Sequence, residues 1–142
     1  MFNKVEKRAL EEQKEVLKFF LDEYGSLLEC CLGFNKAYKK LDLYSMGIYA
    51  GNIHGILQRT AEVIRKVNSL ERVITGKYVE CARDSFNLFI TNKIDYLLFH
   101  EFKKQKNGNI INTGKTYKKK FNLPRRDVPL MCVEDLEVSK EI

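Results

Sequence analysis

The sequence of 142 residues contains no tryptophan, only two prolines and two histidines, and no long apolar run. A helix that crosses a membrane needs about 18 or more consecutive apolar residues, so we expect no transmembrane segment. The first residues, MFNKVEKRALEEQKE, are charged throughout and lack the apolar block of a signal peptide. Both absences predict a cytoplasmic, intracellular protein that does not associate with a membrane.

Metal-binding and catalytic motifs are also missing. The four cysteines include the adjacent pair Cys30 and Cys31, but no C-x-x-C spacing occurs and no histidine lies at ligand spacing from a cysteine. This predicts small, buried, apolar cysteine side chains in a reducing compartment and no metal site. Neither His54 nor His100 accompanies a recognisable nucleophile motif. We therefore predict a non-enzymatic protein with no catalytic residue and no cofactor.

One segment, GNIINTGKT, has part of the pattern of a phosphate-binding loop. A Walker A motif reads GxxxxGK[ST], whereas Gly108 and Gly114 have one residue more between them. A helix should also follow Thr116, because its N-terminus holds the phosphate. Instead the chain continues as YKKKFNLPRR, which contains Pro124. The spacing therefore argues against nucleotide hydrolysis.

An apolar pattern with a seven-residue period runs through the N-terminal region. Its members are Leu10, Leu17, Tyr24, Cys31 and Tyr38, together with a second set at Phe20, Leu27, Phe34 and Leu41. Gln13 interrupts the second set at its first position. The pattern predicts a long helix over about residues 6–42, or two helices with a bend near Gly33. Its apolar face either packs in the core of a bundle or forms the seam of a homo-oligomer.

Three glycines, Gly47, Gly51 and Gly55, lie four residues apart within SMGIYAGNIHGIL, where apolar residues otherwise recur at helical spacing. Each glycine inside a helix costs roughly 0.5–1 kcal/mol relative to alanine. Close approach of another helix backbone would offset that cost through added dispersion contacts. We therefore predict a second helix whose glycines form a helix-packing groove, filled by the long first helix or by a second copy of the chain.

A third helix is predicted over about residues 70–92. Asn68 and Glu71 have the spacing of a capping box, and apolar residues recur beyond them. Gly76 is the weak point of this helix, and RVITGKYVE is alternatively a short hairpin.

Turn signals become stronger after residue 93. The dipeptide Asn107-Gly108 predicts a tight turn and hence a hairpin that pairs residues 96–105 with residues 110–118. Pro124 then favours an extended tail.

These predictions combine into a mostly α protein of the α+β class. It would have about three amphipathic helices followed by a basic β-hairpin and an extended C-terminal tail. Residues 1–102 would form the helical scaffold, and residues 103–142 the basic hairpin and acidic tail.

Charge is distributed unevenly over the C-terminal third. From Lys103 to Arg126 there are nine cations and no acid, whereas Asp127 to Ile142 contains five acids and one lysine. Clustered lysine and arginine neutralise phosphates and release counterions, while aromatic rings stack on exposed bases. A two-stranded ribbon can also enter a major groove. The basic segment 103–126 therefore predicts contact with DNA or RNA.

The predicted nucleic-acid-binding residues are Lys115, Tyr117, Lys118, Lys119, Lys120, Phe121, Arg125 and Arg126. On a strand, Lys118 and Lys120 would project from one face and Lys119 from the other. The alternatives are a solvated basic loop, contact with an acidic protein surface, or a helical protein-interaction module such as a phage-type inhibitor or regulator of a host protein. The frequent lysine, asparagine and isoleucine are typical of an AT-rich genome, such as that of a low-GC bacterium or its phage or another mobile element.

Overall fold

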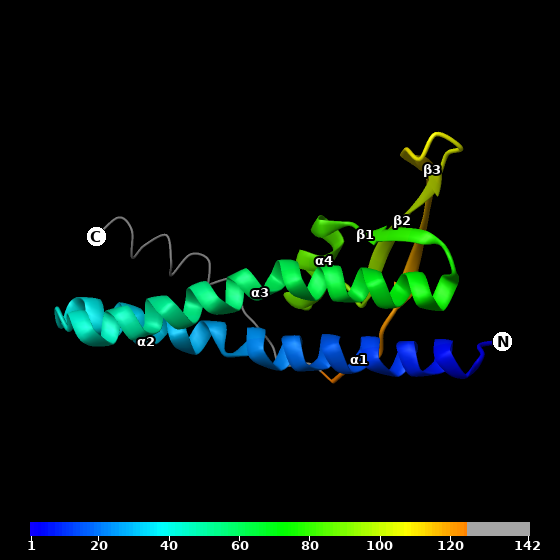
Figure 1. The fold of residues 1–142 in the computed structure, drawn as a ribbon. Helices are drawn as coiled ribbons and strands as arrows, with labels where there is room; N and C mark the ends of the chain where they lie inside the picture. Colours follow the sequence, from blue (N-terminus) through cyan, green and yellow to red (C-terminus); the bar gives the residue numbers. More distant parts are fainter. Residues whose placement is uncertain (125–142) are drawn as a thin grey trace.

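A computed structural model describes residues 1–124 and shows a mostly helical protein of the α+β class (Figure 1). In the described part of the chain the elements are α1 (Lys4–Gly25), α2 (Leu27–Lys39), α3 (Leu43–Thr75), β1 (Tyr78–Cys81), α4 (Arg83–Ile90), β2 (Tyr96–Lys104) and β3 (Ile110–Lys120). Helices α1 and α2 follow one another along the length of α3. The sheet lies over the C-terminal end of α3, which is the end that lies close in space to the N-terminus of the chain. None of the helices in residues 1–124 combines the length and apolar character that a bilayer crossing requires.

The predicted N-terminal helix is divided in two at Ser26 rather than bent near Gly33. A capping box between Asn3 and Glu6 begins α1, because the Asn3 side chain accepts from the Glu6 amide and the Glu6 carboxylate accepts from the Asn3 amide. At Ser26 the backbone amide bonds back to the carbonyls of the preceding turn, and α2 starts one residue later. The heptad pattern continues across this break, so both helices turn an apolar face towards α3.

The prediction of a single helix over residues 70–92 is wrong. Helix α3 runs on to Thr75 and ends at Gly76, which has φ +70° and donates its amide to the carbonyl of Arg72. A left-handed residue at this position terminates a helix, and glycine adopts that conformation without a steric penalty. The chain then enters β1, and only Arg83–Ile90 returns to helix as α4.

Three antiparallel strands form a sheet in the order β1-β2-β3. The turn between β2 and β3 contains Gly108 at φ +88°, and the amide of Gln105 donates to the carbonyl of Asn109. A register shift follows the His100 pair, and Gly114 at φ +82° lies in the bulged stretch of β3. The glycine of the GKT sequence therefore serves a β-bulge, and a strand rather than a helix follows it.

The core lies between the inner face of the sheet and the helices. Its largest fully buried side chains include Leu17 and Phe20 of α1, Phe86 and Phe89 of α4, and Leu97 and Phe99 of β2. The heptad residues Leu17, Tyr24 and Cys31 are buried here, so most of the apolar stripe packs within the chain, although Leu41 is exposed. The domain boundary predicted after residue 102 falls inside β2, and the predicted acidic tail lies outside the described residues.

The predicted glycine groove is not filled by the first helix. A Cβ atom at Gly47 or Gly51 would meet no non-neighbouring atom within 4 Å in the described part of the chain, and one at Gly55 would face only the Arg59 guanidinium at 3.5 Å. Helix α3 packs on α2 through a different face, where a Cβ at Gly33 would lie 2.5 Å from the ring of Tyr49. The close approach in this helix pair therefore depends on Gly33. Packing of the glycine stripe on a second copy stays a prediction.

Two alanine substitutions should have opposite effects on stability. Gly51→Ala should raise the free energy of unfolding by about 0.5–1 kcal/mol, because it improves helix propensity in open space. Gly33→Ala should lower it by about 1–3 kcal/mol, because the new methyl group overlaps the Tyr49 ring. Urea denaturation followed by circular dichroism measures both. In a Tyr49→Ala background the Gly33→Ala penalty should disappear; a penalty that persists would show that the ring contact is not its cause.

Candidate functional site

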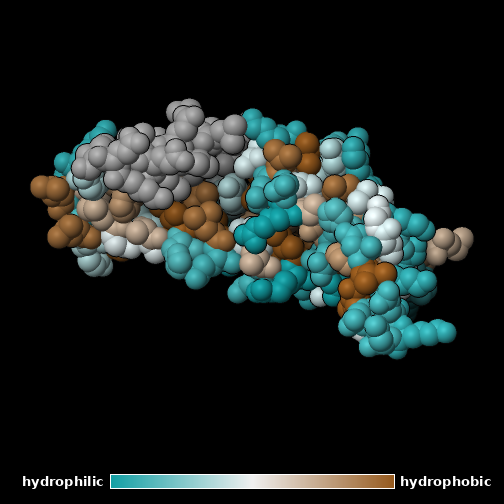
Figure 2. Space-filling model, turned by 90° about the horizontal axis from the view of Figure 1, so that it is seen from above, coloured by the Kyte–Doolittle hydropathy of each residue, from teal (hydrophilic) through white to brown (hydrophobic). Residues whose placement is uncertain are grey.

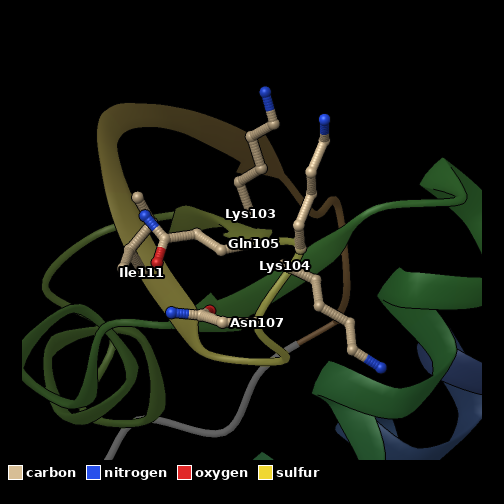
Figure 3. Close-up of a pocket in the computed structure, with 6 residues that line it drawn as sticks. Lys103, Lys104, Gln105, Asn107 and Ile111 are labelled. Carbon is tan, nitrogen blue, oxygen red and sulfur yellow. The ribbon is translucent and has the colours of Figure 1, made fainter.

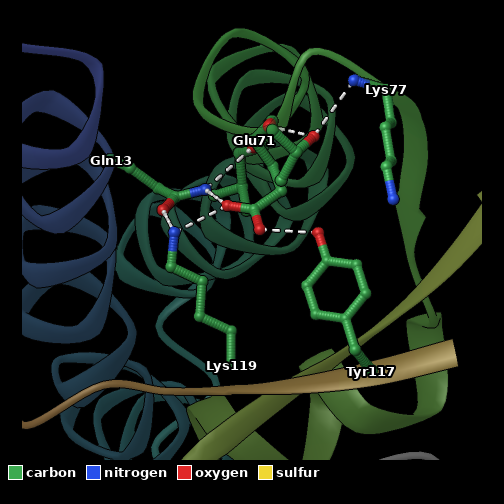
Figure 4. Close-up of polar contacts among 7 residues, drawn as sticks. Gln13, Glu71, Lys77, Tyr117 and Lys119 are labelled. Carbon is green, nitrogen blue, oxygen red and sulfur yellow. Dashed lines mark hydrogen bonds and ion pairs between the residues drawn. The ribbon is translucent and has the colours of Figure 1, made fainter. Parts of the chain in front are cut away.

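A buried polar network connects the basic segment to the helices (Figure 4). The Glu71 carboxylate of α3 has only 2% of its side-chain surface exposed and accepts from Lys119 Nζ at 2.7 Å and from Tyr117 Oη at 2.7 Å. Gln13 of α1 accepts from Lys119 Nζ at 2.8 Å and donates from Nε2 to Glu71 at 3.1 Å and to the Val67 carbonyl at 3.2 Å. The network thus joins α1, α3 and β3.

Phe121 lies in the core and Tyr117 is half-buried against it, whereas the sequence predicts that one of these rings stacks on bases of a single strand. The Tyr117 ring stacks on Phe99 with centroids 5.4 Å apart, and Phe121 is buried against Phe89. Burial, and then the hydrogen bond to Glu71, raise the pKa of the Tyr117 hydroxyl well above its usual range. Phe121 is therefore closed to a base, and Phe99 covers one face of the Tyr117 ring.

Lys119, another residue of the predicted contact set, is not available to a ligand in the same way, because its side chain is only 20% exposed and is paired with Glu71. Its neighbours alternate as a strand requires. Lys118 lies on the outer face with its Nζ 4.6 Å from the centre of the Tyr96 ring, and Lys120 forms an ion pair with Asp95 at 3.3 Å. Only Lys118 of these three lysines therefore presents a charge that no carboxylate neutralises within residues 1–124.

Further lysines lie along the hairpin, whose far end projects away from the helices (Figure 1). We call the exposed cations of β2, β3 and their turn that form no ion pair within residues 1–124 the hairpin lysines: Lys103, Lys104, Lys106, Lys115 and Lys118. Within residues 1–124, none of them lies within ion-pair distance of a carboxylate. The contact residues predicted from sequence lie within residues 115–126 and do not include Lys103, Lys104 or Lys106, although the absence of acids extends back to these lysines.

A hollow of about 520 Å³ lies at the hairpin turn (Figure 3). Lysine side chains, two amides and one isoleucine line it: Lys103, Lys104, Gln105, Lys106, Asn107 and Ile111. The lysine side chains extend away from the ribbon, so their ammonium groups are available to an anionic ligand. The hollow is thus a cationic surface with amide donors and one apolar side chain. Arg125 and Arg126 of the predicted set lie outside the described residues.

Other chemistry-bearing groups do not assemble into a site in the part of the chain that the structure describes. No cluster of histidine, cysteine and acidic side chains there has the arrangement of a metal centre. His54 is exposed on α3, whereas His100 lies on β2 opposite Glu80 and Thr116. Burial raises the pKa of the Cys81 thiol to about 11, which keeps it protonated and unreactive at neutral pH.

Known proteins give no further guide to this site. No protein-family model matches the chain, and neither the curated proteins nor the solved structures contain a match to it. The function must therefore be argued from the charge, exposure and geometry of the hairpin itself.

Two neighbouring lysines should respond differently to the same substitution. Lys119→Met should lower the free energy of unfolding by about 3–5 kcal/mol, because it leaves the buried Glu71 carboxylate without its cation. Lys118→Met should cost no more than about 1 kcal/mol, since only an exposed cation–π contact with Tyr96 is lost.

Urea denaturation of both variants tests this difference. Adding Glu71→Leu to the Lys119→Met variant should recover part of the lost stability, because the buried charge is then removed. Equal stabilities of the two single variants would contradict the assignment of Lys119 to the interior.

Proposed function

We propose that this protein is a non-enzymatic nucleic-acid-binding protein and that the hairpin lysines contact the phosphate backbone. The observation that carries the proposal is the set of five exposed lysines on a projecting two-stranded ribbon, with no carboxylate within ion-pair distance in residues 1–124. Such a surface attracts a polyanion along its length, and phosphates are the ligands that clustered lysines neutralise. The contact set therefore shifts towards the hairpin turn from the one predicted by sequence.

The acids around the sheet do not cancel this field. Glu80 pairs with Arg72 at 3.2 Å, and Glu101 pairs with Lys77 at 3.5 Å. Asp95 is neutralised by Lys120, as described above. Each of these carboxylates is therefore matched locally, and the excess positive charge stays with the hairpin lysines.

The ribbon geometry also suits a long anionic ligand. The strands β2 and β3 are paired on both sides of the bulge, so the ribbon that carries the hairpin lysines is a defined scaffold. An ordered scaffold reduces the entropy that the ligand contact must overcome. Lysine contacts to phosphate position a protein on nucleic acid without reading the base sequence. We therefore propose binding with little sequence preference.

A second candidate function is a protein-interaction module, such as a phage-type inhibitor or regulator of a host protein. It is supported by apolar side chains exposed at the turn between α2 and α3, where Leu41, Leu43 and Tyr44 are each at least 76% exposed. Figure 2 shows apolar surface at this end of the molecule. An apolar end of this kind suits a protein surface rather than a phosphate backbone. The hairpin lysines would then contact an acidic protein surface.

Two triple variants with the same change of charge distinguish the candidates. The turn variant changes Lys103, Lys104 and Lys106 to glutamine, and the helix-end variant changes Lys36, Lys39 and Lys40, which lie at the α2 end. Three to five phosphate contacts predict that log affinity falls with log salt at a slope of about −3 to −4.5. The turn variant should reduce the steepness of that slope by about 2–3 and weaken binding at least about tenfold at low salt.

Fluorescence anisotropy with labelled single- and double-stranded oligonucleotides at several salt concentrations gives both quantities. The helix-end variant should bind like the wild type. Equal losses in both variants would mean that net charge, not the hairpin, attracts the ligand. No binding to either oligonucleotide at low salt, including after removal of the acidic residues 127–142, would overturn the proposal and favour a protein partner.

A further inference from the structure

Two aromatic side chains lie opposite each other on the outer face of the sheet, the face turned away from the helices. Tyr78 of β1 is 43% exposed and pairs directly with Phe102 of β2, which is partly exposed. Residues that oppose each other on neighbouring antiparallel strands share a face of the sheet, with their Cβ atoms about 4.5–5.5 Å apart. We call Tyr78 and Phe102 the aromatic pair.

The core of the protein does not use the aromatic pair. The core lies on the opposite face of the sheet, where Val79, Leu97 and Phe99 are fully buried. In residues 1–124 neither ring of the aromatic pair belongs to a core cluster. A hollow of about 240 Å³ also borders Tyr78, and its other lining residues are Arg72, Gly76 and Lys77. A cross-strand aromatic contact contributes to the stability of a sheet, but these rings also remain accessible to a ligand.

Positive charge without an acidic partner lies next to the aromatic pair. Lys104 follows Phe102 by two residues, about 7 Å along the strand, and therefore projects from the same face. It forms no ion pair within residues 1–124, and it also lines the hollow at the hairpin turn. The acid that β1 carries on this face, Glu80, is matched by an arginine of α3 at 3.2 Å. An anionic chain that extends from the hairpin turn along the outer face thus meets the aromatic pair.

Rings and lysines on one face favour a single-stranded nucleic acid over a duplex. Proteins that bind single strands without sequence preference combine a basic surface with aromatic rings on which successive bases stack. Lysines contact the phosphates of either form, but the bases of a duplex already stack on one another inside the double helix. The rings therefore contribute only where bases are unpaired. Tyr96 lies on the same face, but Lys118 lies over its ring, so the aromatic pair offers the accessible rings.

We propose that the protein binds single-stranded nucleic acid across the outer face of the sheet, with bases stacked on Tyr78 and Phe102. This inference rests on the proposed function, because the hairpin lysines hold the phosphates of the same strand. A duplex binds through these lysines alone. The rings predicted from sequence for stacking lie on and just beyond β3, whereas the aromatic pair belongs to β1 and β2. Tyr78 was not in the predicted set, because the sequence favours a helix over residues 70–92.

Fluorescence anisotropy of the full-length protein with three labelled oligonucleotides at low salt tests the proposal. The three are an oligothymidine strand, an abasic strand of the same length and charge, and a duplex. Wild-type protein should bind oligothymidine at least about fivefold more tightly than the abasic strand, because one stacked base contributes at least that factor. The Tyr78→Leu/Phe102→Leu double variant should lose this advantage. It should bind the duplex like the wild type, since its lysines remain.

Tyr44→Leu is the matched control, because Tyr44 is 80% exposed but lies at the start of α3. This variant should keep the wild-type affinity for all three oligonucleotides. The Tyr78→Trp variant gives an independent signal, since the wild-type chain contains no tryptophan. Bases that stack on the introduced ring should quench its emission when oligothymidine binds, whereas the abasic strand should leave the emission unchanged.

Three results would each overturn the stacking and leave the proposed function intact. They are equal wild-type affinities for the two single strands, an equal loss of duplex and oligothymidine binding in the double variant, and unquenched emission of the Tyr78→Trp variant bound to oligothymidine. No binding of the wild type to any of the three oligonucleotides, also after removal of residues 127–142, would overturn both proposals.

Discussion

The rest of the structure depends on one buried ion pair, between Glu71 of α3 and Lys119 of β3. Removing two charges from water is costly, and here the cost is offset by a short contact and by hydrogen bonds from Tyr117 and Gln13. The pair also specifies the strand register. A shift of β3 by one residue would turn Lys119 outward and place an apolar core position on the surface, leaving the Glu71 carboxylate buried without a cation. The alternation that buries Lys119 is what directs Lys118 and Lys120 to the opposite face.

The helices and the hairpin turn could largely be predicted from sequence, because their signals are local. The heptad pattern reported which face of α1 and α2 is buried, and Asn107-Gly108 reported the turn between β2 and β3. The end of α3 could not be predicted as firmly, since a glycine inside an apolar segment is compatible with a weak helix as well as with a left-handed cap. Gly76 adopts the second conformation, and the chain beyond it forms β1, which pairs with β2.

The candidate site was predictable as a segment but not residue by residue. The sequence shows how many cations lie between Lys103 and Arg126, but it does not show which of them form an ion pair with a buried acid. Gln13 was visible as a polar interruption of an apolar stripe, but its partners lie 54 to 106 residues away in the chain. The prediction for the glycine stripe on α3 was incomplete for a related reason. The spacing shows that the three glycines share one face of a helix, but only the packing shows that no other described element covers this face. Contacts between residues far apart in the sequence therefore determine both the burial of Lys119 and the exposure of the glycine stripe.

The hairpin is separated into a buried face, anchored at its base by Glu71, and an exposed surface that carries the hairpin lysines. Amide chemical shifts of uniformly ¹⁵N-labelled protein, recorded while a DNA duplex is added at low salt, test this separation most directly. We expect shift changes to concentrate in residues 102–118 and to be absent from the α2–α3 turn and from the amides around Gln13. Changes centred on the α2–α3 turn, with the hairpin unaffected, would contradict the account.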